Sequence, residues 1–169
     1  MTVSPWREQP TEQARLFNPA FLGALVLCAA DGYESNTQEG QGLPYPLAFI
    51  AVPIVLHKLT REALPRTTRT SLPAWISVNT QTQVGFPARA SSLVSSTKDS
   101  IAVACHGHLL AIEGSRLRAC AKMSAVARFA STVKSPEVSD CLKKAQFVGK
   151  WFAGSGDYQT IMALWGVRP

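Results

Sequence analysis

The sequence predicts a mainly α-helical protein: a single domain with a winged-helix-like core of helices and one small β-hairpin. Several segments carry apolar residues at the spacing of one helix face, begin near a capping residue and end near a glycine. Two short apolar segments around a glycine turn, near residues 109–119, indicate the hairpin. With 169 residues, 46% of them apolar, and no internal repeat or linker, we expect one core over residues 18–169, after a polar N-terminal segment of residues 1–17.

The first predicted helix begins at Asn18 and Pro19, which are a good N-cap and a good first-turn residue. The apolar residues that follow recur at helical spacing until Asp31 and Gly32. Residues 33–42 are rich in Gly, Gln, Asn and Glu without any periodicity, and this composition predicts a mobile surface loop.

A second apolar segment, Pro46–His57, predicts a helix that Pro53 should bend or break, because proline removes one helical hydrogen bond and clashes with the preceding turn. Residues 60–65 resemble a short capped turn. Ser71 is expected to cap another helix, which should end near Asn79.

A longer helix is predicted from residue 85 to His106, where apolar and small residues share one face before Gly107. The hairpin follows directly, with strands at 109–112 and 116–119. A helix that runs straight into a small hairpin is how a winged-helix unit ends, and this order favours a winged-helix-like core.

The C-terminal part predicts two more helices, after residues 120–134, which show no readable pattern. Ser135 and Pro136 open a helix that Gly154 should end. Asp157 is expected to cap the last helix, which ends at Gly166.

The charge balance is positive, with 17 Lys and Arg against 11 Asp and Glu and a formal net charge of +6. Such a balance favours binding to nucleic acid, to an anionic lipid surface or to an acidic protein, and it does not distinguish among these partners. The positive residues gather modestly at 58–69, 116–122 and 143–150, without a dedicated basic arm. Only 17% of residues are charged, so we expect apolar surface that a partner covers.

The cysteines and the apolar runs indicate a cytoplasmic protein. The four cysteines are far apart and form no C-x-x-C pair, which predicts reduced and mostly buried thiols. The N-terminal segment lacks the apolar centre of a signal peptide. The longest apolar run, Leu43–Leu56, contains three prolines and is too short to span a bilayer.

We expect no catalytic site, cofactor or metal. The sequence has no phosphate-binding loop G-x-x-x-x-G-K-[ST], no G-x-S-x-G elbow and no H-E-x-x-H motif. The cluster Cys105–His108 has zinc-ligand chemistry, but no second Cys/His cluster exists to complete a site. Cys105 and His106 are adjacent on a predicted helix and should point in different directions. A cryptic hydrolase stays an alternative, because triads assemble in space.

A basic segment with Lys58, Arg61, Arg66 and Arg69 lies between two predicted buried helices and should be exposed. Its charges are either simply solvated or anchor an acidic partner or phosphate, for which the arginine fork offers bidentate bonds. Arg61 and Arg69 are the first choices for such anchors.

The predicted hairpin offers the strongest case for DNA contact, through Arg116, Arg118 and the following Lys122. The preceding helix carries only two permanent cations, Arg89 and Lys98. Few of its side chains could hydrogen-bond to base edges, so sequence-specific DNA recognition is not favoured.

Most tryptophans on the predicted helices should pack in the core, while one or two are free to face a partner. The segment Trp165–Pro169 lies past its helix and is a candidate docking tail, with Trp165 and Arg168 as its contact residues.

Several segments, taken in order, resemble the middle component of bacterial three-component ABC ATPase systems. These segments are Asn18-Pro19-Ala20-Phe21, Leu43-Pro44 to Leu56-His57-Lys58, Thr70-Ser71-Leu72 to Trp75, Val84-Gly85-Phe86 and Gly166-Val167-Arg168-Pro169. In that family the ATPase is a separate SMC-like or Rad50-like chain and the third chain varies. The systems are thought to act against phages and other mobile DNA.

The resemblance implies a non-catalytic adaptor that couples the ATPase chain to the variable third component. A winged-helix DNA-binding module of the same machine and a cryptic hydrolase remain the alternatives. DNA contact through the complex and a homo-oligomer both stay open, and no membrane partner is expected.

Overall fold

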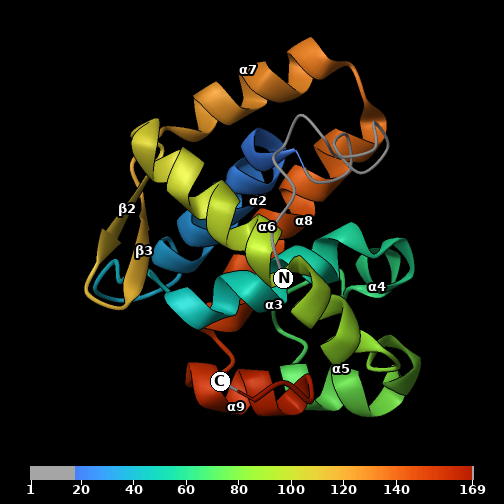
Figure 1. Cartoon of the computed structure of the whole chain (residues 1–169). Helices are drawn as coiled ribbons and strands as arrows, with labels where there is room; N and C mark the ends of the chain where they lie inside the picture. The colour runs from blue at the N-terminus through green and yellow to red at the C-terminus, as the bar shows by residue number, and fades with distance from the viewer. Residues whose placement is uncertain (1–17, 169) are drawn as a thin grey trace.

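Helix α2 (Pro19–Glu34) occupies the centre of the structure, a computed structural model that describes residues 18–168. Residues 22–30 of α2 are all buried, so this helix is apolar around its whole circumference, as expected when other helices enclose it. The longest helices beside it are α3 (Tyr45–Leu56), α6 (Phe86–His106) and α8 (Pro136–Ala153) (Figure 1). The predicted mainly helical fold is confirmed. No helix within the described residues is long and apolar enough to cross a bilayer.

The predicted starts of three helices are confirmed by their caps. The Asn18 side chain accepts a hydrogen bond from the backbone N–H of Ala20 at 2.9 Å. Ser135 caps α8 in the same way, and Asp157 caps α9 (Tyr158–Leu164). Each side chain satisfies an N–H that has no partner within its own helix.

Helix α3 continues through Pro53 and ends one turn later, at Leu56. The chain changes direction at His57, which is extended, and helix α4 (Lys58–Ala63) begins immediately. The proline therefore leaves the helix intact, although it cannot donate a backbone hydrogen bond. The predicted turn at residues 60–65 is wrong for its first four residues, which belong to α4.

A small antiparallel sheet lies at one end of α6, to the left in Figure 1. Strands β2 (Leu110–Glu113) and β3 (Arg116–Ala119) form the predicted hairpin. A third strand that was not predicted, β1 (Leu43–Pro44), pairs with β3 and gives the order β1-β3-β2. A strand of two residues, one of them proline, carries no alternation that sequence reasoning could detect.

An aromatic cluster joins the short helices α5 (Leu72–Val78) and α9 to the core. The rings of Trp165 and Phe86 are 4.5 Å apart between centroids, and the Trp75 ring lies 6.0 Å from that of Trp165. Trp165 is 0% exposed, so its prediction as an exposed docking residue is wrong. Its indole fills the space between α5 and α6, where burial of a large ring is more favourable than exposure.

Arg61 is also buried, and its prediction as a surface anchor is wrong. Its guanidinium donates to Oδ2 of Asp140 at 2.9 Å and to Oε1 of Glu137 at 3.0 Å. A third hydrogen bond, 2.7 Å long, reaches the carbonyl of Val55 in the last turn of α3. The two carboxylates lie on α8, about 80 residues away in the sequence. No local sequence pattern could therefore predict this pairing. Arg61 thus ties α3 and α4 to the start of α8.

Two glycines let the backbones of α2 and α8 approach closely. A methyl group on Gly149 would overlap the carbonyl of Ala29, and one on Gly32 would overlap the carbonyl of Gln146. The Gln146 amide also donates to Asp31 at 2.7 Å, next to this contact. Backbone atoms cannot move away as a flexible side chain can, so both positions require glycine.

We expect Gly149→Ala to lower the free energy of unfolding by about 3 kcal/mol, because the added methyl must push α2 and α8 apart. The control is Gly154→Ala, whose methyl would meet only ordinary van der Waals contact and should change stability by less than about 0.5 kcal/mol. Urea unfolding followed by circular dichroism measures both values. Equal stability of the two variants would contradict the close contact.

The double variant Glu137→Gln/Asp140→Asn keeps the hydrogen-bond acceptors around Arg61 and removes the opposite charges. It should cost about 2 kcal/mol, less than a fully buried pair, because both carboxylates are partly exposed. The control is Glu62→Gln, which breaks an exposed pair with Lys58 and should cost under about 0.5 kcal/mol. Thermal unfolding compares the two, and an equally small loss would argue against the Arg61 network.

Candidate interaction surface

The exposed arginines of the predicted basic segment lie on a loop that is anchored at both ends. The indole N–H of Trp75 donates to the carbonyl of Ala63 at 3.0 Å, and that of Trp151 donates to the carbonyl of Thr70 at 2.7 Å. Arg66 and Arg69 lie between these anchors and are exposed. Neither forms an ion pair with another residue of the described chain. This loop therefore presents two positive charges on a fixed backbone.

The hairpin arginines are partly engaged inside the protein. Arg116 is half-buried and donates to the carbonyl of Gly42 at 2.8 Å. Arg118 is exposed but lies 3.4 Å from a Glu113 oxygen and 3.9 Å from a Glu34 oxygen. Lys122 is exposed where the chain leaves the sheet. The two carboxylates beside Arg118 weaken the positive field of the hairpin.

The cluster at residues 105–108 ends helix α6. Gly107 caps the helix, and His108 has a positive φ of 55° as the chain turns toward β2. Burial raises the pKa of the Cys105 thiol, and the neighbouring Cys120 adds to this effect. Across residues 18–168, no three His, Cys, Asp or Glu side chains are placed to hold a metal ion together.

The two cysteines that face the core are protonated at neutral pH. Burial, with a smaller contribution from Asp31, raises the pKa of Cys28 to about 12. Burial also raises the pKa of Cys141, against the opposing influence of Arg61. Since the thiolate is the nucleophilic form, neither thiol is poised for nucleophilic chemistry.

Helix α7 (Met123–Val133) is an element that the sequence analysis missed. It lies across the top of the molecule in Figure 1, over α2 and α8. Its apolar residues recur at helical spacing, yet none of its residues is buried, and Phe129 and Val133 are 38% and 42% exposed. The spacing of Met123, Val126, Phe129 and Val133 was the available signal, obscured by small and polar residues between them.

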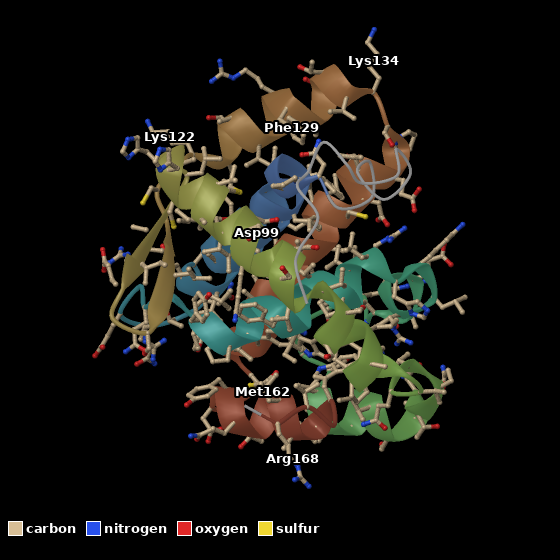
Figure 2. The ribbon with its side chains drawn as sticks, in the orientation of Figure 1. Asp99, Lys122, Phe129, Lys134, Met162 and Arg168 are labelled. Carbon is tan, nitrogen blue, oxygen red and sulfur yellow. The ribbon has the colours of Figure 1, made fainter. Side chains whose placement is uncertain are left out.

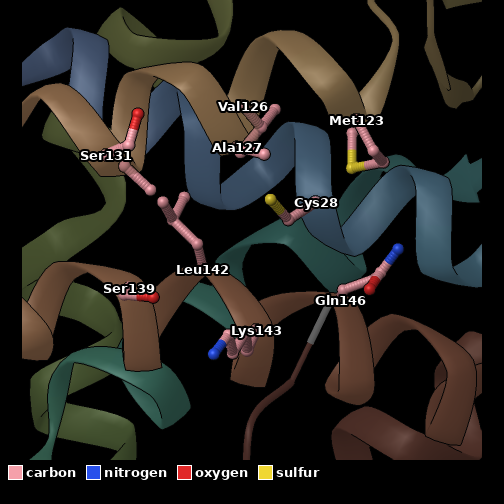
Figure 3. A pocket seen from close by; sticks show the side chains of 10 residues that line it. Cys28, Met123, Val126, Ala127, Ser131, Ser139, Leu142, Lys143 and Gln146 are labelled. Atoms are coloured by element: carbon pink, nitrogen blue, oxygen red, sulfur yellow. The ribbon is translucent and has the colours of Figure 1, made fainter.

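Three apolar hollows run along the two sides of α7. The first, about 370 Å³, opens between α7 and α8, and Figure 3 shows Met123 and Val126 facing Leu142 and Gln146, with Cys28 between the two helices. The second is about 180 Å³ and the third about 380 Å³. We call them together the α7 groove; its apolar lining includes Phe21, Leu27, Leu56, Leu109, Met123, Val126, Phe129, Val133, Val138 and Leu142.

Positive charges surround the α7 groove. Residues 120–150 contain six lysines and arginines, namely Lys122, Arg128, Lys134, Lys143, Lys144 and Lys150. Lys122 and Lys134 stand at the two ends of α7 (Figure 2), and Lys143 lines the first hollow. The two acidic residues of this segment, Glu137 and Asp140, are both bonded to Arg61. The surface is thus apolar with a basic rim.

The remaining predicted contact residue is Arg168, which is exposed at the C-terminal end. The predicted partner residues therefore divide into two groups. Arg66, Arg69 and Arg168 remain available on the surface, whereas Arg61 and Trp165 stabilise the fold.

Comparisons with known proteins give one match. A family model described as ABC-three component (ABC-3C) system Middle Component 3 matches residues 6–169. Searches of curated proteins and of solved structures found no match. The matched region covers nearly all of the sequence, including every helix and strand described above. The chain therefore belongs to the Middle Component 3 family of ABC-three component systems.

Proposed function

We propose that this chain is a non-catalytic adaptor that couples a separate SMC-like ABC ATPase to the variable third component of its system, in defence against phages and mobile DNA. The observation that carries the proposal is membership of a middle component family, which implies partner chains. The motif content agrees, because the sequence has no phosphate-binding loop of its own.

The distribution of exposed groups supports a role that needs two contact surfaces. The α7 groove lies at one end of the molecule, and helices α5 and α9 lie at the other (Figure 1). The loop with Arg66 and Arg69 leads directly into α5. An apolar surface with a basic rim and a separate pair of arginines suit two different partners, since arginines and exposed apolar residues are enriched at interfaces.

Co-expression with the ATPase and the third chain encoded beside this protein tests the adaptor proposal. All three chains are expected to co-purify in a constant ratio, measured by size-exclusion chromatography with light scattering. If this chain stays monomeric and binds neither neighbour, the adaptor proposal fails.

Arg69→Glu is expected to weaken capture of one of the two neighbours about tenfold, because it reverses an exposed charge on a fixed loop. Lys98→Glu is the matched control, since it makes the same charge change on the exposed face of α6. Immobilised variants and purified partners give the affinities. An equal effect of the two variants would exclude a specific contact at Arg69.

A winged-helix DNA-binding module is the second candidate. It is supported by the hairpin that directly follows α6 and by β1, which follows α2 and completes a sheet of order β1-β3-β2, while two further short helices, α4 and α5, lie between α3 and α6. Against it, Arg116 and Arg118 already bond to groups of the protein. If DNA binds there, Lys122→Gln should reduce the slope of log affinity against log salt by about 1. A salt series without affinity for duplex DNA at low ionic strength removes this candidate.

A further inference from the structure

The packing of α7 leaves much of its apolar face uncovered. The helix is amphipathic, but no residue of it is buried, and hollows lie on both of its sides. Phe129 contributes to the second and third hollows while remaining 38% exposed. A partner that fills the hollows would remove this apolar area from water, and such burial is the main favourable term in association.

The size and form of the groove suit side chains of a helix. The first and third hollows, about 370 and 380 Å³, are within the range of sites that hold apolar ligand groups. The second and third hollows share Phe129 and lie along the same side of α7, the second toward Ala121 and the third toward Ser135, so anchors spaced along one partner helix can enter both. This is how an amphipathic helix binds in a groove, through residues at i, i+3 or i+4, and i+7.

The charges around the groove determine the kind of helix that fits. Lys122, Lys134 and Lys143 lie at its ends and along its rim. Glu137 is the single acidic residue that lines the three hollows among the described residues, and it is bonded to Arg61. Acidic residues beside the apolar anchors of a partner helix could therefore pair with these lysines, because no carboxylate lining the hollows already pairs with them.

Neither helix α7 of a second copy nor the composition of residues 1–17 offers the acidic charge that the groove would attract. Helix α7 contains one arginine and no acidic residue, so α7 from another copy would meet like charge. Residues 1–17 carry two arginines and two glutamates and have no net negative charge to offer. The complementary occupant is therefore a different, acidic protein.

We propose that the α7 groove binds an amphipathic helix with acidic flanking residues, supplied by one of the two other chains of the system. This inference rests on the proposed adaptor function and identifies the surface and the chemistry of one contact. Phe129 and Val126 contact the apolar anchors, and Lys122 and Lys134, at the two ends of α7, pair with the acidic flanks.

The test uses overlapping synthetic peptides that cover the ATPase and the third chain encoded beside this protein. Each labelled peptide is titrated with the intact purified chain, and binding is followed by fluorescence anisotropy. We expect binding by a peptide that has apolar residues at helical spacing and a net negative charge, and weakening of that binding by salt.

Charge reversal locates the contact. Lys122→Glu/Lys134→Glu should weaken peptide binding about tenfold, whereas Lys98→Glu, which does not line any of the hollows, should leave it unchanged. The same peptide with Gln in place of its Glu residues should bind weakly and should no longer respond to the reversal. Because the weak binding of the Gln peptide is measured on the unchanged protein, that result holds even if a protein variant folds poorly.

Phe129→Ser should also weaken binding about tenfold, since an apolar anchor contact is lost. The exposure of Phe129 makes the fold tolerant of this change, and a melting curve verifies that the variant is folded.

Three outcomes overturn the proposal while the adaptor function stands. In the first, the three chains assemble but no acidic peptide binds. In the second, the bound peptide responds to Arg69→Glu and not to the Lys122 and Lys134 reversal. In the third, the groove is filled by a peptide of residues 1–17 or by self-association of the chain. Failure of the three chains to assemble would instead contradict the adaptor function itself.

Discussion

The close contact between α2 and α8 is the constraint on which the rest of the structure depends. Gly32 and Gly149 remove the side chains that would keep the two backbones apart. Once α8 lies against α2, its first two turns bring Glu137 and Asp140 to Arg61, and its last turns bring Trp151 to the aromatic cluster. Packing at this one contact therefore positions groups at both ends of the molecule.

The same contact creates the floor of the α7 groove, because Cys28 and Leu27 of α2 and Leu142 of α8 lie beneath α7. The body of the protein is closely packed, while α7 rests on it without a buried residue. A rigid body with one weakly covered amphipathic helix is well suited to binding a partner, because little of the core must be disrupted to expose more apolar surface.

The arginines illustrate how the fold divides one residue type between two roles. Arg61 is enclosed by Val55, Glu137 and Asp140 and holds elements together. Arg66 and Arg69, only a few residues away, are exposed on a loop that two tryptophans hold in place. The division follows from position on α4, since Arg61 is on the side of this short helix that faces α8, and the other two lie beyond its end.

The sequence by itself determined the helical class, most helix starts and ends, and the hairpin, because caps, apolar periodicity and glycine turns act within a few residues. It also indicated the family, because the segments that resemble the family occur in order from Asn18 to Pro169. Only the tertiary structure decided which polar and aromatic residues are buried. Arg61 finds its carboxylates about 80 residues away, and Trp165 packs on Phe86 across a similar separation. Strand β1 depends on pairing with β3, and the groove exists only where α2, α7 and α8 meet. These features rest on contacts between distant segments, and no local pattern of residues encodes such contacts.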